Sequence, residues 1–194
     1  MVSPVSSPPL MSASIVLNTF EHLGKVGARA EVLRRLDQGC RDRLANLLGS
    51  EWVALADHLA VYQATLEALG SARSYEVWRD IMLITLQKGL YSKLWLGLGR
   101  VNKGSPLNFY RHSGAGWAMA TKGCGVQAWE GDQRRGVLMW SDLPRSMVES
   151  VGFCSAMRAK VEAVLIAAHV DGSVEELRRD VDAGVLHVQS TWRP

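Results

Sequence analysis

Apolar residues recur along this chain with two different periods. Between Ile15 and Leu36 they are spaced three and four residues apart, which is typical of a helical stripe, and Gly24 and Gly27 interrupt that stripe. We therefore expect two helical pieces in this stretch, with a break between them.

Further helical segments are predicted before residue 124. Their limits are set by glycines that end helices and by serines or a proline that begin them. They are a short helix at 41–48 ended by Gly49, a helix from Ser50 to Gly70, a segment from Ser74 through Ile84 and Leu90 to Leu98, and a helix from Pro106, capped by Ser105, to Gly123.

The period changes to two in CGVQAWEGDQRRGVLMW, residues 124–140. Two alternating segments flank a loop with Gly-Asp, which predicts a β-hairpin. Val185–Trp192 also alternates, while Ser173–Val181 fits either a helix or a charged edge strand. Between the two strand regions, Phe153–Ala168 carries the strongest helical pattern in the chain.

These elements predict an α+β fold. Two hairpins separated by a long helix can pair into one four-stranded antiparallel sheet with helices on one face, and an isolated hairpin would hardly be stable in water. Residues 1–14, with three prolines and five serines, are expected to be a disordered leader without the features of a secretory signal. Residues 15–194 are expected to form a single domain, helical over 15–122 and containing the sheet over 123–194.

Composition excludes several classes of protein. A net charge of +3, from 22 basic and 19 acidic residues, is too small to indicate nucleic-acid binding. No apolar run approaches the roughly 20 residues of a membrane span. Cys40, Cys124 and Cys154 are widely spaced, which favours buried, reduced thiols in a cytoplasmic protein over disulfides or a structural zinc site.

The C-terminal half resembles a known group of proteins. The run from Gly97 to Gly172, followed by AGVLHVQSTW, is similar to a myxobacterial paralogous family of uncharacterised proteins of about 200 residues. More remotely it resembles the 4-vinyl-reductase-type small-molecule-binding domain, the haem–nitric-oxide-binding-like domains and the vesicle-tethering TRAPP subunits. Gly152-Phe153-Cys154 at the start of the long helix and Gly184 before the last strand carry the likeness, over roughly residues 91–192.

The resemblance implies a ligand-binding or protein-interaction module, often dimeric, rather than an enzyme. Metal-binding cysteines are sometimes found near the last strands of the small-molecule-binding relatives. Here that region offers His169 and His187 but no cysteine, so the resemblance gives no reason to expect a metal.

His112, within FYRHSGAGW, lies between aromatic residues and next to glycines that would let a ligand approach the backbone. It is a candidate haem ligand or general base, and the alternative is an ordinary surface or half-buried histidine. Other motifs are incomplete: GLGRVNKG lacks the phosphate-loop pattern, and Ser113 and Ser155 lack a nucleophile elbow. Cys154 begins a helix, but its apolar neighbours favour an inert thiol.

We therefore expect a non-enzymatic cytoplasmic protein-interaction or regulatory module that forms a homodimer or docks a protein partner through an apolar helical face. No catalytic residue, metal or cofactor is expected. The alternative is a small-molecule sensor, for haem or a small hydrophobic ligand, with an apolar pocket between the Phe153–Ala168 helix and the sheet. The candidate ligand-binding residues are Tyr110, His112, Trp117, Trp129, Trp140, Phe153 and Met157.

Overall fold

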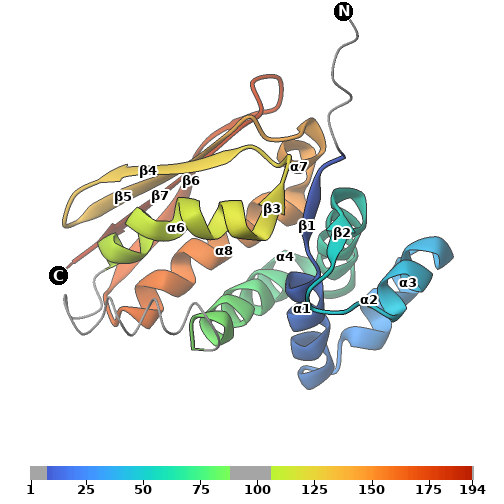
Figure 1. Cartoon of the computed structure of the whole chain (residues 1–194). Coiled ribbons are helices and arrows are strands. Elements are labelled where there is room, and N and C mark those ends of the chain that lie inside the picture. Colours follow the sequence, from blue (N-terminus) through green and yellow to red (C-terminus); the bar gives the residue numbers. More distant parts are fainter. Residues whose placement is uncertain (1–7, 88–105, 194) are drawn as a thin grey trace, which may run out of the picture.

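The computed structural model describes residues 8–87 and 106–193. Within these ranges the chain forms helices and two antiparallel sheets, which confirms the predicted α+β class (Figure 1). The helices are α1 (Ala13–Lys25), α2 (Arg29–Arg35), α3 (Gln38–Ala45), α4 (Leu55–Gln87), α6 (Pro106–Ala120), α7 (Arg145–Glu149) and α8 (Val151–Ala167). The strands are β1 (Leu10–Ser12), β2 (Trp52–Ala54), β3 (Thr121–Lys122), β4 (Val126–Gly131), β5 (Arg135–Ser141), β6 (Gly172–Asp180) and β7 (Val185–Trp192).

The larger sheet is the one predicted from the two hairpins. Its strand order is β4-β5-β7-β6, so the central contact joins the second strand of each hairpin. In this pairing Met139 lies opposite His187, and Leu138 lies opposite Val188. The ambiguous segment at 173–181 is a strand, β6, because its backbone pairs with β7 along its length.

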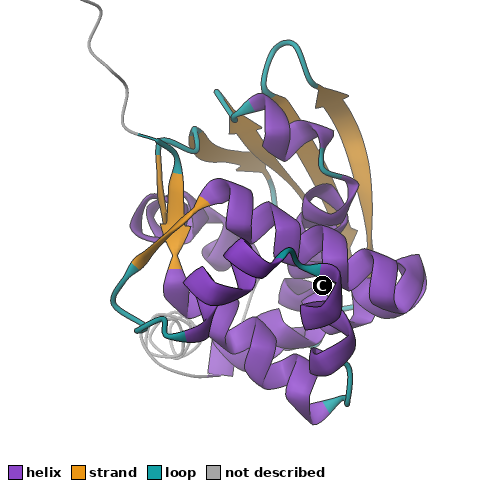
Figure 2. Cartoon of the chain, turned by 90° about the vertical axis from the view of Figure 1, so that its right-hand side faces the viewer, coloured by secondary structure: helices purple, strands orange, loops and turns teal. Residues whose placement is uncertain are grey.

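One face of this sheet packs on helices. Leu138 and Trp140 of β5 and Leu186 and Val188 of β7 are buried on that face, and α6 and α8 lie against it (Figures 1 and 2). The residues that alternate with them on β7, such as His187, are half-exposed on the opposite face. No helix of the described residues covers that opposite face.

Helix α8 connects the sheet to the helical part of the fold. Its first turn is capped by the Ser150 hydroxyl, which accepts a hydrogen bond from the Phe153 amide at 3.2 Å. Its other side packs along α4, where the Tyr62 ring centre is 4.5 Å from that of Trp78 and 5.9 Å from that of Phe153. This aromatic cluster is almost completely buried, so α8 forms the middle layer between the sheet and α4.

Helix α4 contains the break that the sequence predicts at Gly70. This glycine has φ +74° and ψ 170°, a conformation that is unfavourable for residues with a Cβ atom. The helical segments before and after Gly70 therefore meet at a glycine, as expected. The predicted continuation from Leu90 to Leu98 lies outside the described residues.

The smaller sheet, ordered β2-β1-β3, was not predicted. Leu10 of β1 pairs with Ala54 and with Lys122, and both partners are far away in the sequence, so no local pattern indicates the pairing. As a result, residues 10–14, assigned above to a disordered leader, form β1 and the start of α1. Trp52 lies in a strand instead of in the helix predicted from Ser50.

Other predicted helix limits also differ from the structure. Helix α3 is Gln38–Ala45 instead of 41–48, because Asp37 caps it by accepting a hydrogen bond from the Cys40 amide at 2.8 Å. Helix α6 ends at Ala120 instead of Gly123, because Thr121 joins β3.

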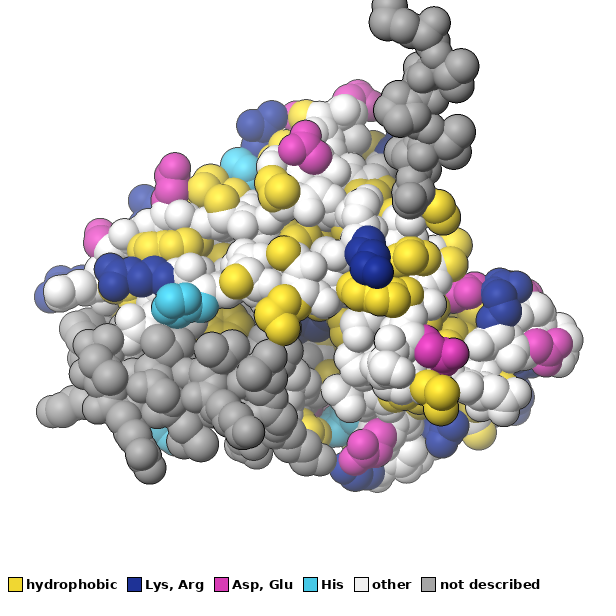
Figure 3. All heavy atoms as spheres, in the orientation of Figure 1, with side chains coloured by type: hydrophobic (Ala, Val, Ile, Leu, Met, Phe, Trp, Pro, Cys, Tyr) yellow, Lys and Arg dark blue, Asp and Glu magenta, His cyan; other side chains and the backbone are white. Residues whose placement is uncertain are grey.

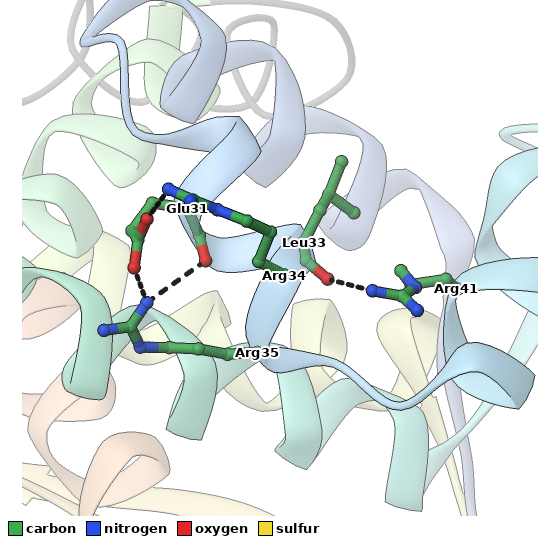
Figure 4. Close-up of polar contacts among 5 residues, drawn as sticks. All are labelled: Glu31, Leu33, Arg34, Arg35 and Arg41. Carbon is green, nitrogen blue, oxygen red and sulfur yellow. Dashed lines mark hydrogen bonds and ion pairs between the residues drawn. The ribbon is translucent and has the colours of Figure 1, made fainter.

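Ion pairs organise the α2–α3 unit (Figure 4). Glu31 accepts hydrogen bonds from Arg34 and Arg35 within α2, and Arg41 of α3 donates to the carbonyl oxygen of Leu33 at 3.4 Å. Arg43 then anchors α3 to α4 through two hydrogen bonds to the Asp57 carboxylate, at 2.8 and 2.7 Å. The basic residues of this unit therefore have structural partners.

Candidate functional site

The predicted ligand-binding residues come from α6, α8 and the β4–β5 hairpin. The hairpin is part of the larger sheet, and both helices lie on the same face of that sheet (Figure 1). The exposure of these residues separates them into two groups. Tyr110, Trp140, Phe153 and Met157 are buried, whereas Trp117 and Trp129 are half-buried and His112 is exposed.

Tyr110 of α6 lies at the centre of the buried group. The Ser190 hydroxyl of β7 lies 3.0 Å from Tyr110 Oη and 3.2 Å from the Gly136 carbonyl oxygen. The Tyr110 ring packs against Trp192, with ring centres 5.8 Å apart, and over Gly136, where a Cβ atom would lie 2.9 Å from the ring. Burial raises the pKa of Tyr110 well above its ordinary value, so its phenol stays neutral and anchors α6 to the sheet.

The residues predicted to border a pocket between α8 and the sheet are mostly buried in the described part of the chain. Phe153 and Met157 of α8 and Trp140 of β5 belong to one continuous core. The Trp117 ring of α6 packs against Trp140, with ring centres 6.2 Å apart, whereas the Phe153 ring packs against Tyr62 of α4. The buried candidates therefore belong to the core through different contacts, and these ring contacts do not join Phe153 to Trp140.

A groove of about 360 Å³ lies at a different place, where β6 begins and β7 ends. It is lined by Asp171, Gly172, Ser173, Thr191, Trp192 and Arg193. None of the predicted ligand-binding residues lines it, and its two hydroxyl groups, on Ser173 and Thr191, are hydrogen-bonded to each other at 2.9 Å.

The outward side of α6 carries the exposed group. Arg111 and His112 are exposed there, and so are the apolar residues Ala115, Ala118 and Met119. Figure 3 shows basic, histidine and hydrophobic side chains near one another on this face of the molecule. The guanidinium carbon of Arg111 lies 5.8 Å from the ring centre of Trp129 on β4. An accessible imidazole, a cation and an indole ring thus occur together at this end of α6.

Sequence reasoning found His112 and Trp129 but missed Arg111 and Ser190. The contact between Arg111 and Trp129 joins residues of a helix and a strand, and Ser190 reaches Tyr110 from the last strand. No sequence motif signals either contact, since both depend on how α6 is placed on the sheet.

The buried histidines have other roles. His58 Nε2 lies 3.3 Å from the Ser12 carbonyl oxygen, and burial lowers the pKa of His58 to about 4. His22 is buried between α1 and α4 without a hydrogen-bond partner on either ring nitrogen, and burial also lowers its pKa, partly opposed by the charge of Asp80. Both imidazoles are therefore neutral parts of the packed helices at neutral pH.

The low pKa of His58 predicts an acid-sensitive fold. In the unfolded chain this imidazole binds a proton below about pH 6.5, whereas in the folded chain it stays neutral down to about pH 4. The unfolded state therefore binds more protons between these values, and the free energy of unfolding should fall by about 2 kcal/mol from pH 7 to pH 5. Urea denaturation across this range tests the prediction, with His58→Gln expected to flatten the slope. An equally steep slope in His58→Gln would contradict it.

The described ranges contain neither a candidate metal site nor a candidate membrane-spanning helix. Among those residues there is no cluster of three or more histidine, cysteine or acidic side chains that could hold a metal ion. None of the helices in residues 8–87 and 106–193 combines the length and the apolar character required to cross a membrane. The three cysteines are free and buried, as predicted.

No protein-family model and no curated protein matches the chain, so its likeness to the myxobacterial family remains a prediction. Solved structures do match. An oxygen-binding H-NOX domain related to soluble guanylate cyclases, solved as its oxygen complex, is similar with a TM-score of 0.64 and 16% identity over 95% of this chain and 96% of that one.

Two further solved structures are similar to this chain to a comparable degree. A variant of the T. tengcongensis H-NOX domain aligns with a TM-score of 0.61 and 12% identity, covering 95% of this chain and 98% of that chain. A structure concerned with modulating haem redox potential through porphyrin distortion aligns with a TM-score of 0.66 and 14% identity, covering 95% and 96% of the two chains. At these identities the likeness shows the fold, which confirms the haem–nitric-oxide-binding-like resemblance at that level.

These matches correct one expectation. We expected no cofactor, but the solved structures that share this fold include haem proteins, which overturns that expectation. The donor set of the described residues is compatible with haem, since His112 offers an accessible imidazole and the adjacent Arg111 offers a cation for a carboxylate. Phe153, Met157 and Trp140 belong to the buried core, so among the described residues these exposed donor groups lie on the outward side of α6.

Proposed function

We propose that this protein is a haem-dependent small-molecule sensor domain and not an enzyme. The observation that carries the proposal is the shared fold over 95% of the chain with H-NOX domains, one of them described as oxygen-binding. Within this fold the chain places an exposed histidine on α6. This favours the sensor alternative over a module that acts only by binding proteins.

In this proposal the His112 imidazole would hold the haem iron and the Arg111 guanidinium would pair with a carboxylate of the haem. When bound, haem iron would supply an open coordination position for a small molecule such as a dissolved gas. The contact of Arg111 with the Trp129 ring restricts the position of the guanidinium, and His112 is the next residue of α6. Tyr110, two residues earlier, fixes α6 on the sheet, so a change at His112 would act on a helix that contacts the core directly.

Haem titration of the purified protein tests the proposal. We expect a one-to-one complex with a Soret absorbance band, and we expect His112→Ala to weaken haem binding by roughly ten- to a hundredfold or to lose the histidine-ligated spectrum. Arg111→Ala should weaken binding less, because it removes one charge-assisted hydrogen bond and no iron ligand.

The matched control is His169→Ala. His169 is also exposed, but it lies after the end of α8 and far from α6 in the sequence. Its replacement should leave the titration unchanged. The absence of any Soret band with the wild-type chain would refute the proposal, and so would a His112→Ala variant that binds haem as the wild type does.

A further inference from the structure

The two edges of the larger sheet differ in how they are protected. At the β4 edge, α6 packs so closely that a Cβ atom on Gly114 would lie 2.5 Å from the Gln127 carbonyl oxygen. The β6 edge has no such cover, since β6 pairs only with β7 among the described strands and most of its residues are exposed. An uncovered strand edge presents unpaired backbone groups that can pair with another strand.

Strand β6 carries an unusual order of charges, with Glu175 and Glu176 before Leu177 and with Arg178 and Arg179 after it. Leu177 is 46% exposed and lies at an irregularity in the pairing between Glu176 and Arg178. A charged, irregular edge often prevents association between strands. Here, however, the sign of the charge reverses at the middle of the strand, so two antiparallel copies would place opposite charges against each other.

We propose that β6 is a dimerisation edge, on which a second copy of this chain pairs antiparallel to extend the sheet across the two molecules. A two-fold axis between Glu176 and Leu177 places Glu175 of each copy opposite Arg178 of the other. Both copies then contribute the same pair, as a closed symmetric interface requires.

The faces of the sheet are consistent with this register. Glu175 lies opposite Gln189 and Arg178 opposite His187, and both β7 residues belong to the half-exposed outer face. Glu175 and Arg178 therefore project on the same face and would meet across the axis. The same register places Val174 opposite Arg179 of the second copy, and these two lie on the inner face opposite Ser190 and Leu186 of β7.

Local partners leave the two charged groups available for this pairing. Glu175 accepts one hydrogen bond from Gln189 at 2.7 Å, and Arg178 donates to Asp180 at 2.7 Å. A carboxylate has about four acceptor sites and a guanidinium five N–H donors, so each can bind a second group. These contacts run to β7 and along β6, and they keep both groups on the outer face of the sheet.

Charge reversal tests the pairing. Sedimentation velocity over a wide range of protein concentration should show a reversible dimer for the wild type, weakened by added salt. Glu175→Arg alone, or Arg178→Glu alone, places like charges opposite each other twice and should raise the dimer Kd at least about tenfold. The double variant Glu175→Arg/Arg178→Glu exchanges the two charges and should recover a Kd close to that of the wild type.

Matched controls come from the opposite edge. Glu130→Arg and Arg134→Glu change the net charge by the same amounts on the β4–β5 hairpin and should leave the Kd unchanged. Circular dichroism verifies that each variant is folded. A wild-type chain that remains monomeric at all concentrations would overturn the proposal, as would a dimer whose Kd is the same in the single reversals. Haem titration is independent of these outcomes, so the dimer and the sensor proposal can fail separately.

Discussion

Replacing Tyr110 by alanine should lower the free energy of unfolding by about 3–5 kcal/mol, which is the range for removing a buried aromatic ring. The ring is fully buried and lies against Trp192 and Gly136, so its removal leaves a cavity between α6 and the sheet. The backbone of β5 approaches α6 only because residue 136 has no side chain. Strand β5 is not free to close the cavity, since it is paired on both sides.

Tyr110→Phe is the matched control. It keeps the ring and removes only the hydroxyl, which leaves the Ser190 hydroxyl with the Gly136 carbonyl as acceptor at 3.2 Å. The loss should be only about 1 kcal/mol. Chemical denaturation of both variants measures the difference. A Tyr110→Ala variant as stable as Tyr110→Phe would mean that α6 is not held to the sheet by this ring.

The second large effect is expected at Gly152, where α8 crosses α4. A Cβ atom on this residue would lie 2.9 Å from the carbonyl carbon and oxygen of Tyr62 and 3.2 Å from the amide nitrogen of Gln63. These are backbone atoms inside a helix, so they cannot move aside as a side chain would. Gly152→Ala should therefore cost about 2 kcal/mol, even though alanine favours helix formation by about 1 kcal/mol.

Gly24→Ala provides the comparison for that result. Gly24 is an exposed residue of α1, and a Cβ atom there meets nothing within 4 Å. This variant should be more stable than the wild type by about 0.5–1 kcal/mol. Thermal or urea denaturation measures the stability of both variants. If Gly152→Ala and Gly24→Ala changed the free energy of unfolding in the same direction, close packing of α8 on α4 at Gly152 would not explain the effect.

Prediction from the sequence succeeded where the signal was local. The alternation over Val185–Trp192 identified β7, and the spacing over Phe153–Ala168 identified α8 nearly to its ends. In β7 every second residue is buried, and in α8 burial covers most of the helix and leaves a stripe that includes Ser155, Glu162 and Ile166 less buried, so periodicity and burial coincide. The pairing of the two hairpins followed because an unpaired hairpin would leave its apolar face in water.

The candidate site was harder to predict. The sequence identified His112 and the aromatic residues as chemically interesting, but the same aromatic character suits a ligand pocket and a packed core equally well. Trp140 and Phe153 turned out to fill the core, while His112 is exposed. Local sequence does not distinguish a buried aromatic residue from one that lines a pocket. Whether a residue is buried depends on which residues of distant elements pack against it.

The sequence by itself determined β4, β5 and β7 of the larger sheet, the long helix beneath it and the candidate imidazole on α6, because each is set by a short-range pattern of apolar spacing or residue chemistry. It left β6 open between a helix and a strand. Only the tertiary structure decided that β1 joins residues near 53 and 121 in a second sheet, that Arg111 lies over the ring of Trp129, and that β6 pairs only with β7 among the described strands. Those features result from contacts between residues far apart in the chain. Such contacts depend on the packing of whole elements, which no local pattern specifies.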